Sequence, residues 1–159
     1  GKAIDLYYKR FVQNDSNVVF DDGSISLKSI TLLDRVGNSD ELATIEWYKD
    51  LKLKFKFLVS ENTNSIPVFK IVIFDKEQRP SAFFEANNKL SNIDIKNGVI
   101  EFVLVHKNLQ LSKGIYSLSM TVHNEINNTP MLRVNNFFSF QVIHETTVWQ
   151  PFFLKTEYN

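Results

Sequence analysis

Small polar side chains occupy every second position between residues 115 and 124. They are Ser117, Ser119, Thr121 and His123, and apolar residues fill the positions between them. Because side chains alternate between the two faces of a strand, these polar groups are expected to share one face. Hydroxyl and imidazole groups donate and accept hydrogen bonds, as the hydroxyl groups of a sugar require. Such a row can form a carbohydrate-binding surface, and a solvated outer face of a sheet is the simpler interpretation for any one of these residues.

Aromatic rings and cations elsewhere in the chain could complete such a surface. A sugar ring has an apolar face that packs on an aromatic side chain, and the candidate rings are Trp47, Tyr48 and Phe84. Lys70 and Arg133 could pair with a phosphate or a sugar acid on a glycan. The predicted carbohydrate-binding residues are therefore Trp47, Tyr48, Lys70, Phe84, Ser117, Ser119, Thr121, His123 and Arg133.

Catalytic chemistry finds little support in the sequence. The chain has no cysteine and three histidines, and none of these histidines lies in a nucleophile-elbow, phosphate-loop or dinucleotide-binding motif. Their spacing does not match a metal site, so no catalytic residue, metal or cofactor is expected. Glu85 and Glu101 could flank a glycosidic bond, which needs two carboxyl groups about 5 to 10 Å apart. Two surface acids are the simpler interpretation.

Composition argues against several classes of partner. The 159 residues carry 18 basic and 18 acidic side chains, and this zero net charge argues against a nucleic-acid-binding protein. No apolar run reaches the roughly 18 to 20 residues of a membrane span, and no signal peptide is visible. Phenylalanine is common, with 14 copies, which favours strands.

The clearest strand pattern runs from Leu51 to Val59. Apolar residues occupy its odd positions, and lysines occupy positions 52, 54 and 56. This alternation is typical of a strand that buries one face and exposes the other, as in antiparallel sheets. The lysine row is expected to face solvent and to protect a sheet edge from aggregation.

Further strands are expected at 24–34, 66–75, 81–87, 98–105, 115–124 and 131–144, with a short one within 41–49. The apolar positions of 24–34 change parity near Lys28 and Ser29, which predicts a bulge. Residues 66–75 are apolar on both faces, which predicts a central strand. Turn residues separate these segments, so the sequence predicts an all-β, immunoglobulin-like antiparallel β-sandwich of about seven to nine strands. We expect this domain at 22–159, after a linker or lead-in segment at 1–21.

Three pieces of sequence carry a resemblance to a known family. They are 24–34 with 52–55, 68–75 with the strand that follows it up to Asn87, and 109–119 with 138–142. The third piece is the most specific, since a leucine and a turn precede Gly114, Tyr116 and Leu118. Over residues 22–145 the chain resembles the C-terminal domain of Wzt-type ATPases, which belong to ABC transporters that export O-antigen polysaccharides.

The resemblance implies a non-catalytic carbohydrate-binding module. Such a module recognises the modified non-reducing end of a lipid-linked O-antigen polysaccharide and couples it to ABC-transporter export. The resemblance also implies a homodimer and a cytoplasmic location at the inner face of the inner membrane. Contact with the transmembrane subunit of the transporter would run through an ATPase domain. This sequence contains no Walker motif, so ATP binding is not expected here.

Two functions of other classes stay open on the sequence. One is an immunoglobulin-like protein–protein adhesion or assembly domain, and the other is a small glycan-acting enzyme that uses Glu85 and Glu101. The tail around Trp149 and Phe153 is apolar enough to need cover. It could pack on a second copy, and exchange of the C-terminal strand between copies is one route to a dimer.

Overall fold

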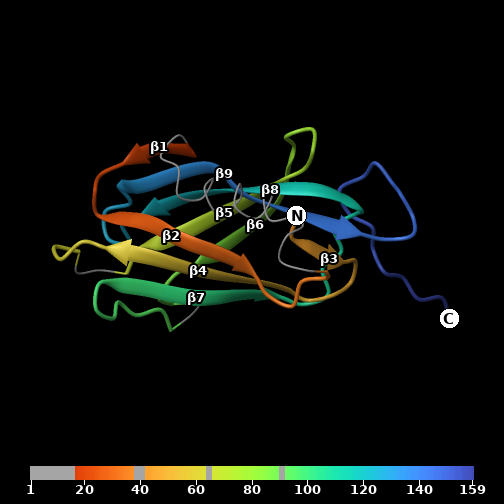
Figure 1. Ribbon diagram of the computed structural model, residues 1–159, viewed down its shortest axis with the longest axis horizontal. Coiled ribbons are helices and arrows are strands. Elements are labelled where there is room, and N and C mark those ends of the chain that lie inside the picture. The colour runs from red at the N-terminus through yellow and green to blue at the C-terminus, as the bar shows by residue number, and fades with distance from the viewer. Residues whose placement is uncertain (1–16, 38–41, 64–65, 90–91) are drawn as a thin grey trace.

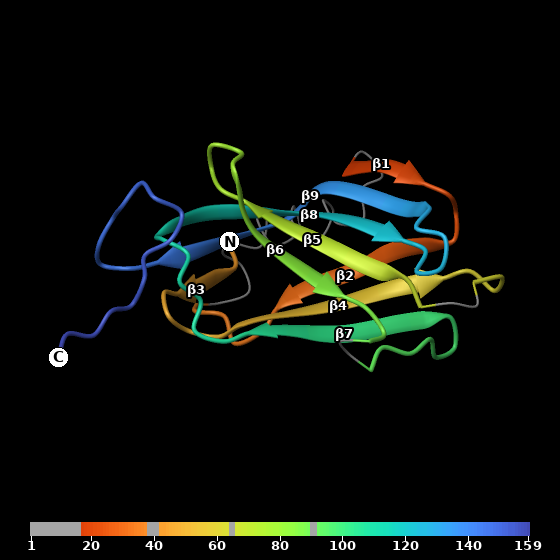
Figure 2. The same ribbon diagram turned by 180° about the vertical axis from the view of Figure 1, so that it is seen from behind.

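The computed structural model describes residues 17–37, 42–63, 66–89 and 92–159. In this part of the chain nine strands form two packed sheets, seen from opposite sides in Figures 1 and 2. The strands are β1 (Val18–Asp21), β2 (Ile25–Leu32), β3 (Thr44–Glu46), β4 (Leu51–Val59), β5 (Val68–Phe74), β6 (Pro80–Ala86), β7 (Val99–His106), β8 (Gly114–His123) and β9 (Pro130–Ile143). The predicted all-β sandwich is confirmed.

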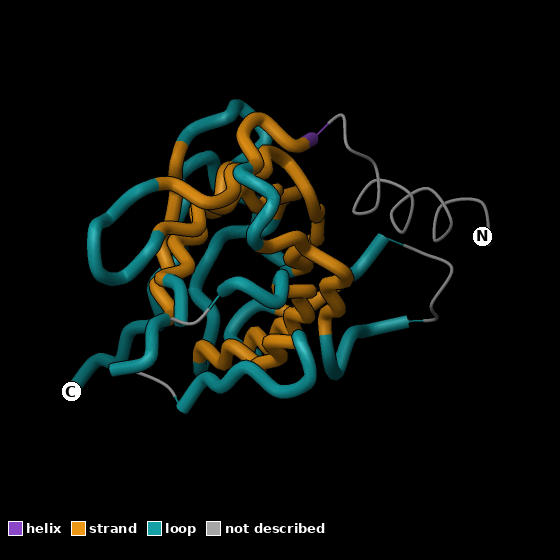
Figure 3. The backbone as a smooth tube through the Cα atoms, turned by 90° about the vertical axis from the view of Figure 1, so that its left-hand side faces the viewer, coloured by secondary structure: helices purple, strands orange, loops and turns teal. Residues whose placement is uncertain are grey.

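The two sheets differ in size. Sheet A has the order β1-β9-β8-β5-β6, and β3 also pairs with β9, whereas sheet B has the order β2-β4-β7. Neighbouring strands are antiparallel, except that β3 runs parallel to β9. Strand β9 is long enough to pair with β1 near Leu132 and with β3 near Val142. Seen along the long axis, the sheets form two layers (Figure 3).

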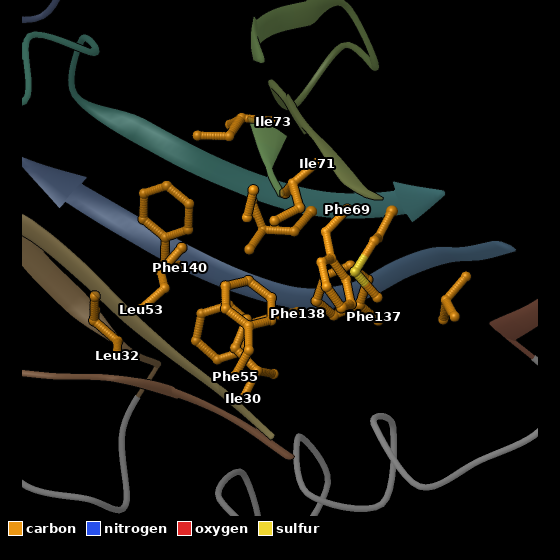
Figure 4. Packing of buried hydrophobic residues seen from close by; sticks show 14 of the residues in the cluster. Ile30, Leu32, Leu53, Phe55, Phe69, Ile71, Ile73, Phe137, Phe138 and Phe140 are labelled. Atoms are coloured by element: carbon orange, nitrogen blue, oxygen red, sulfur yellow. The ribbon is translucent and has the colours of Figure 1, made fainter. Parts of the chain in front are cut away.

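Phenylalanine side chains fill the space between the layers. Five of them are almost completely shielded from solvent: Phe55, Phe57, Phe69, Phe137 and Phe140. The rings of Phe57 in sheet B and Phe69 in sheet A lie 4.6 Å apart between centroids, so aromatic contacts join the two sheets. Figure 4 shows Phe55 of β4 facing the side chains of sheet A across this core. The high phenylalanine content therefore serves the core.

Strand β4 has the predicted one-sided burial. The apolar side chains on its inward face are fully buried: Leu51, Leu53, Phe55 and Phe57. On the outward face, the Nζ atom of Lys52 lies 2.9 Å from the Asp34 carboxylate. The Nζ atom of Lys54 lies 3.3 Å from the Glu101 carboxylate. The predicted role in protecting a sheet edge is wrong, because β4 lies between β2 and β7 and both of its edges are paired.

Two further predictions about strands are confirmed. The register between β2 and β4 shifts between Leu27 and Ser29, where the sequence predicts a bulge. Strand β5 is central in sheet A, between β8 and β6. Only one face of β5 is fully buried, however, because Val72 and its neighbours on the other face are half-buried.

The segment before the predicted domain enters the sandwich. Its last four residues, Val18–Asp21, form β1 and pair with β9. Residues 1–16 of the predicted linker or lead-in segment lie outside the described residues.

Candidate functional site

The polar residues of β8 lie on the outer face of sheet A, where the neighbouring strands add two cations. Lys70 of β5 is the register partner of Thr121 on one side, and Arg133 of β9 is its partner on the other. Because adjacent strands are about 4.8 Å apart, the two cations flank the threonine with Cα atoms roughly 10 Å apart. Lys70 and Thr121 are half-buried and Arg133 is exposed. Three residues far apart in sequence therefore form one polar row across the sheet, which we call the cation row.

The cation row continues to both edges of sheet A. Glu85 of β6 is the register partner of Lys70, and Phe20 of β1 is the partner of Arg133. Phe20 is exposed, so an aromatic residue is available next to Arg133 in the sheet register. Across the sheet, the cation row and its two flanking residues thus combine a hydroxyl group and two cations with one carboxylate and one aromatic ring.

Ser117 and Ser119 have a second role, because they hold a bulge in β9. The register shifts between Leu118 and Met120, opposite Asn136, whose backbone is left-handed with a φ of 46°. The backbone N–H of Asn136 donates to the Ser119 hydroxyl at 3.0 Å. The Ser117 hydroxyl donates to the side-chain oxygen of Asn136 at 3.1 Å. Each hydroxyl keeps further hydrogen-bonding capacity for a ligand.

His123 closes the polar row at the end of β8. It pairs with Val68 of β5 and Pro130 of β9. Its Nδ1 atom lies 3.5 Å from the carbonyl oxygen of Asn128, in the loop that joins β8 to β9. The structure thus brings six of the nine predicted residues onto one face of sheet A: Lys70, Ser117, Ser119, Thr121, His123 and Arg133.

Trp47 and Tyr48 lie at the opposite end of β8 from His123, where the C-terminal segment crosses the sandwich. The indole Nε1 of Trp47 donates to the carbonyl oxygen of Phe153 at 2.9 Å. The Trp47 ring packs edge-on against His144, with centroids 4.6 Å apart, and Lys155 lies over the Tyr48 ring. An open pocket of about 610 Å³ adjoins Trp47 and His144. These two aromatic residues therefore form a group separate from the cation row.

Phe84 lies on the inner side of sheet A. Its register partner is the buried Ile71, and its ring lies 6.0 Å from the ring of His106 in sheet B. The neighbouring Phe83 is 57% exposed and shares the outer face with Glu85. Sequence reasoning missed Phe83. The available signal was its two-residue spacing from a charged glutamate, which should share its solvent face.

A cleft of about 370 Å³ lies beside the start of β8, between the β5–β6 turn and residues 148–151. Asp75 lines the cleft and is nearly buried, and its carboxylate accepts hydrogen bonds from the Arg79 backbone N–H at 2.9 Å and from Arg79 Nε at 2.6 Å. Burial opposes ionisation of this carboxyl, but the bonds from Arg79 outweigh it and hold the pKa of Asp75 below its ordinary value. Sequence reasoning named no residue of this cleft as a binding residue.

The described residues offer no arrangement for the alternative chemistries. Glu85 faces outward from sheet A and Glu101 faces outward from sheet B, so the core separates them and they cannot flank one glycosidic bond. No cluster of histidine and acidic side chains suited to a metal ion occurs in the described part of the chain. Within the same residues, no helix has the length and apolar character needed to cross a membrane.

Sequence comparison identifies the family. The profile of the Wzt C-terminal domain matches residues 17–151. The chain belongs to the Wzt C-terminal domain family. The suspected resemblance is thereby confirmed, and membership of this family implies a carbohydrate-binding role in O-antigen export and association with an ABC transporter. No curated protein sequence matches the chain closely enough to count as a relative.

Solved structures agree with this fold. A crystal structure of the C-terminal domain of Wzt superposes with a TM-score of 0.69 at 18% identity, covering 88% of this chain and 86% of that one. A Niemann-Pick type C2 protein from the Japanese carpenter ant superposes with a TM-score of 0.52 at 15% identity, covering 78% of this chain and 98% of that one. At these identities the similarity establishes the fold alone.

Proposed function

We propose that this Wzt C-terminal domain is a non-catalytic module that binds O-antigen polysaccharide on the outer face of sheet A. One observation carries the proposal: strand register places Lys70 and Arg133 on either side of Thr121. Family membership supplies the class of ligand.

The groups on this face have complementary tasks. Ser117, Ser119 and Thr121 exchange hydrogen bonds with the hydroxyl groups of the sugar. Arg133 and Lys70 bind a negatively charged substituent, for which the planar guanidinium group offers two parallel hydrogen bonds. Phe83 and Phe20 are exposed at opposite sides of the face, where an aromatic ring can cover the apolar side of a pyranose.

We further propose the finer points that the resemblance to this family suggests. The module binds the modified non-reducing end of a lipid-linked chain and so licenses the export of completed chains. It acts as a homodimer in the cytoplasm, at the inner face of the inner membrane, and an ATPase domain connects it to the transmembrane subunit. His123, Trp47 and Tyr48 are proposed as outlying glycan contacts, at opposite ends of β8.

Titration calorimetry with O-polysaccharide from the source organism tests the proposal. We expect Arg133→Ala to weaken binding by about 10- to 100-fold, because a hydrogen bond to a charged group contributes roughly 1.5 to 3 kcal/mol. Lys54→Ala is the matched control, since Lys54 is a partly exposed cation on the outer face of sheet B. Unchanged affinity of Arg133→Ala would remove this face as the site.

Terminal recognition is tested with chains that carry or lack the terminal modification. The proposal expects binding of the modified chain alone. Equal binding of both chains would retain the carbohydrate-binding role and reject terminal recognition. Binding of neither chain by the folded protein would reject the role altogether and favour a domain that binds a protein partner.

A further inference from the structure

The polar row on β8 leads into the cleft at the start of that strand. Ile115 has the same parity as Ser117 and Ser119, is 45% exposed, and lines the cleft together with Arg79 and Trp149. A chain molecule lying along the outer face of β8 would therefore reach this cleft directly beyond Ser117. The cleft and the polar row form one continuous surface.

Trp149 is the dominant apolar group of the cleft, and 75% of its surface is exposed. The Arg79 guanidinium lies over the indole, 5.8 Å from its centroid, and Nη2 of Arg79 donates to the Trp149 carbonyl oxygen at 3.1 Å. The same guanidinium is fixed by the Asp75 carboxylate. An acid, a cation and an exposed ring thus form a chain of contacts from the sheet to the surface.

The backbone that carries this ring is fixed as well. The Ser112 hydroxyl donates to the carbonyl oxygen of Gln150, and the Ser112 backbone N–H donates to that of Pro151 at 2.9 Å. Together with the bond from Arg79 to Trp149, these bonds hold the carbonyl groups of three consecutive residues, Trp149, Gln150 and Pro151. A ring presented on an ordered backbone loses little further freedom when a ligand binds, which favours affinity.

We propose that the cleft is a sugar-stacking subsite, in which one pyranose ring of the glycan packs its apolar face against the Trp149 indole. The inference rests on the proposed function and adds a site to it. A pyranose has an apolar face and a polar rim, which matches an exposed indole beside polar and charged groups. Lys76 and Lys113 line the same cleft and are exposed, so they can reach hydroxyl or acidic groups on the rim.

Binding of O-polysaccharide from the source organism to the full chain tests the subsite. We expect Trp149→Ala to weaken binding at least about tenfold and Trp149→Phe, which keeps an aromatic surface, to stay within about threefold of the unaltered protein. Ile126→Ala is the control, because Ile126 is an 85% exposed apolar residue in the β8–β9 loop, at the other end of β8. Its affinity should be unchanged.

Tryptophan emission gives a second readout, since the chain has two tryptophans. Saturating polysaccharide should shift the emission of the unaltered protein, and the Trp149 share of that shift should be missing in Trp149→Phe. Unaltered affinity of Trp149→Ala, or identical shifts in both proteins, would overturn the subsite and leave the proposed function intact. Failure of the unaltered protein to bind would overturn the proposed function and the subsite with it.

Discussion

At the residue scale, Tyr116, which lines the cleft, has a strongly raised pKa. Its side chain is buried, and its hydroxyl donates to the carbonyl oxygen of Ser112 at 2.7 Å. Burial and then the negative charge of Asp75 raise the pKa of Tyr116 to about 12. The fold therefore favours the neutral phenol, in which the hydroxyl can still donate its hydrogen bond.

This raised pKa predicts a loss of stability at alkaline pH. In the unfolded chain the phenol ionises near pH 10, whereas in the folded chain it stays neutral up to about pH 12. The stability that the neutral phenol contributes to the folded state is therefore fully present below about pH 10 and is lost as pH rises toward 12. The loss is on the order of 2 to 3 kcal/mol. Urea unfolding between pH 9 and 12 should show a shallower decline for Tyr116→Phe than for the unaltered protein. Tyr158→Phe, at a fully exposed site, is the control, and equal declines for all three proteins would contradict the assignment.

At the scale of elements, the β9 bulge couples the fold to the proposed glycan-binding face. The Ser119 hydroxyl accepts the backbone N–H of Asn136, and that residue has a left-handed backbone conformation. Ser119→Ala leaves this N–H without its partner. We expect a loss of about 1 kcal/mol in the free energy of unfolding, measured in urea, and weaker glycan binding than expected for one missing hydroxyl. Ser26→Ala, on the exposed face of β2, should be neutral; equal stabilities would show that the bulge does not need Ser119.

The individual strands also show which features of the structure the sequence alone predicts. The strict alternation of apolar and polar residues predicted β4 and β8, because in each strand the inward apolar residues occupy every second position throughout. The bulge in β9 was not predictable, since Asn135-Asn136-Phe137-Phe138 fits two parities and only the register with β8 selects one. The same ambiguity affects Phe83 and Phe84, for which pairing with β5 decides which ring is exposed. The cation row was predicted residue by residue, but its geometry depends on pairing among three strands.

At the scale of the whole molecule, the C-terminal segment is part of the sandwich. The Phe153 backbone N–H donates to the Gln110 carbonyl oxygen at 2.9 Å, and Phe152 forms a bridge with Leu111. Leu111 is 1% exposed, and the indole of Trp47 also bonds to this segment. The segment therefore covers one end of the core, although Trp149 and Leu154 on it stay exposed.

Two truncations test whether the C-terminal segment stabilises the sandwich by covering its core. The shorter one, which removes only the last exposed residues, is the control. Removal of residues 149–159 eliminates several backbone hydrogen bonds and uncovers Leu111. We expect a loss of about 3 kcal/mol or more, which corresponds to a melting temperature lower by roughly 6 to 12 °C. Removal of residues 157–159 alone should leave the melting temperature unchanged, because these residues are exposed. If the longer truncation had the same melting temperature as the intact chain, the C-terminal segment would not contribute to the stability of the sandwich. Trp149 would then not be held on a fixed backbone.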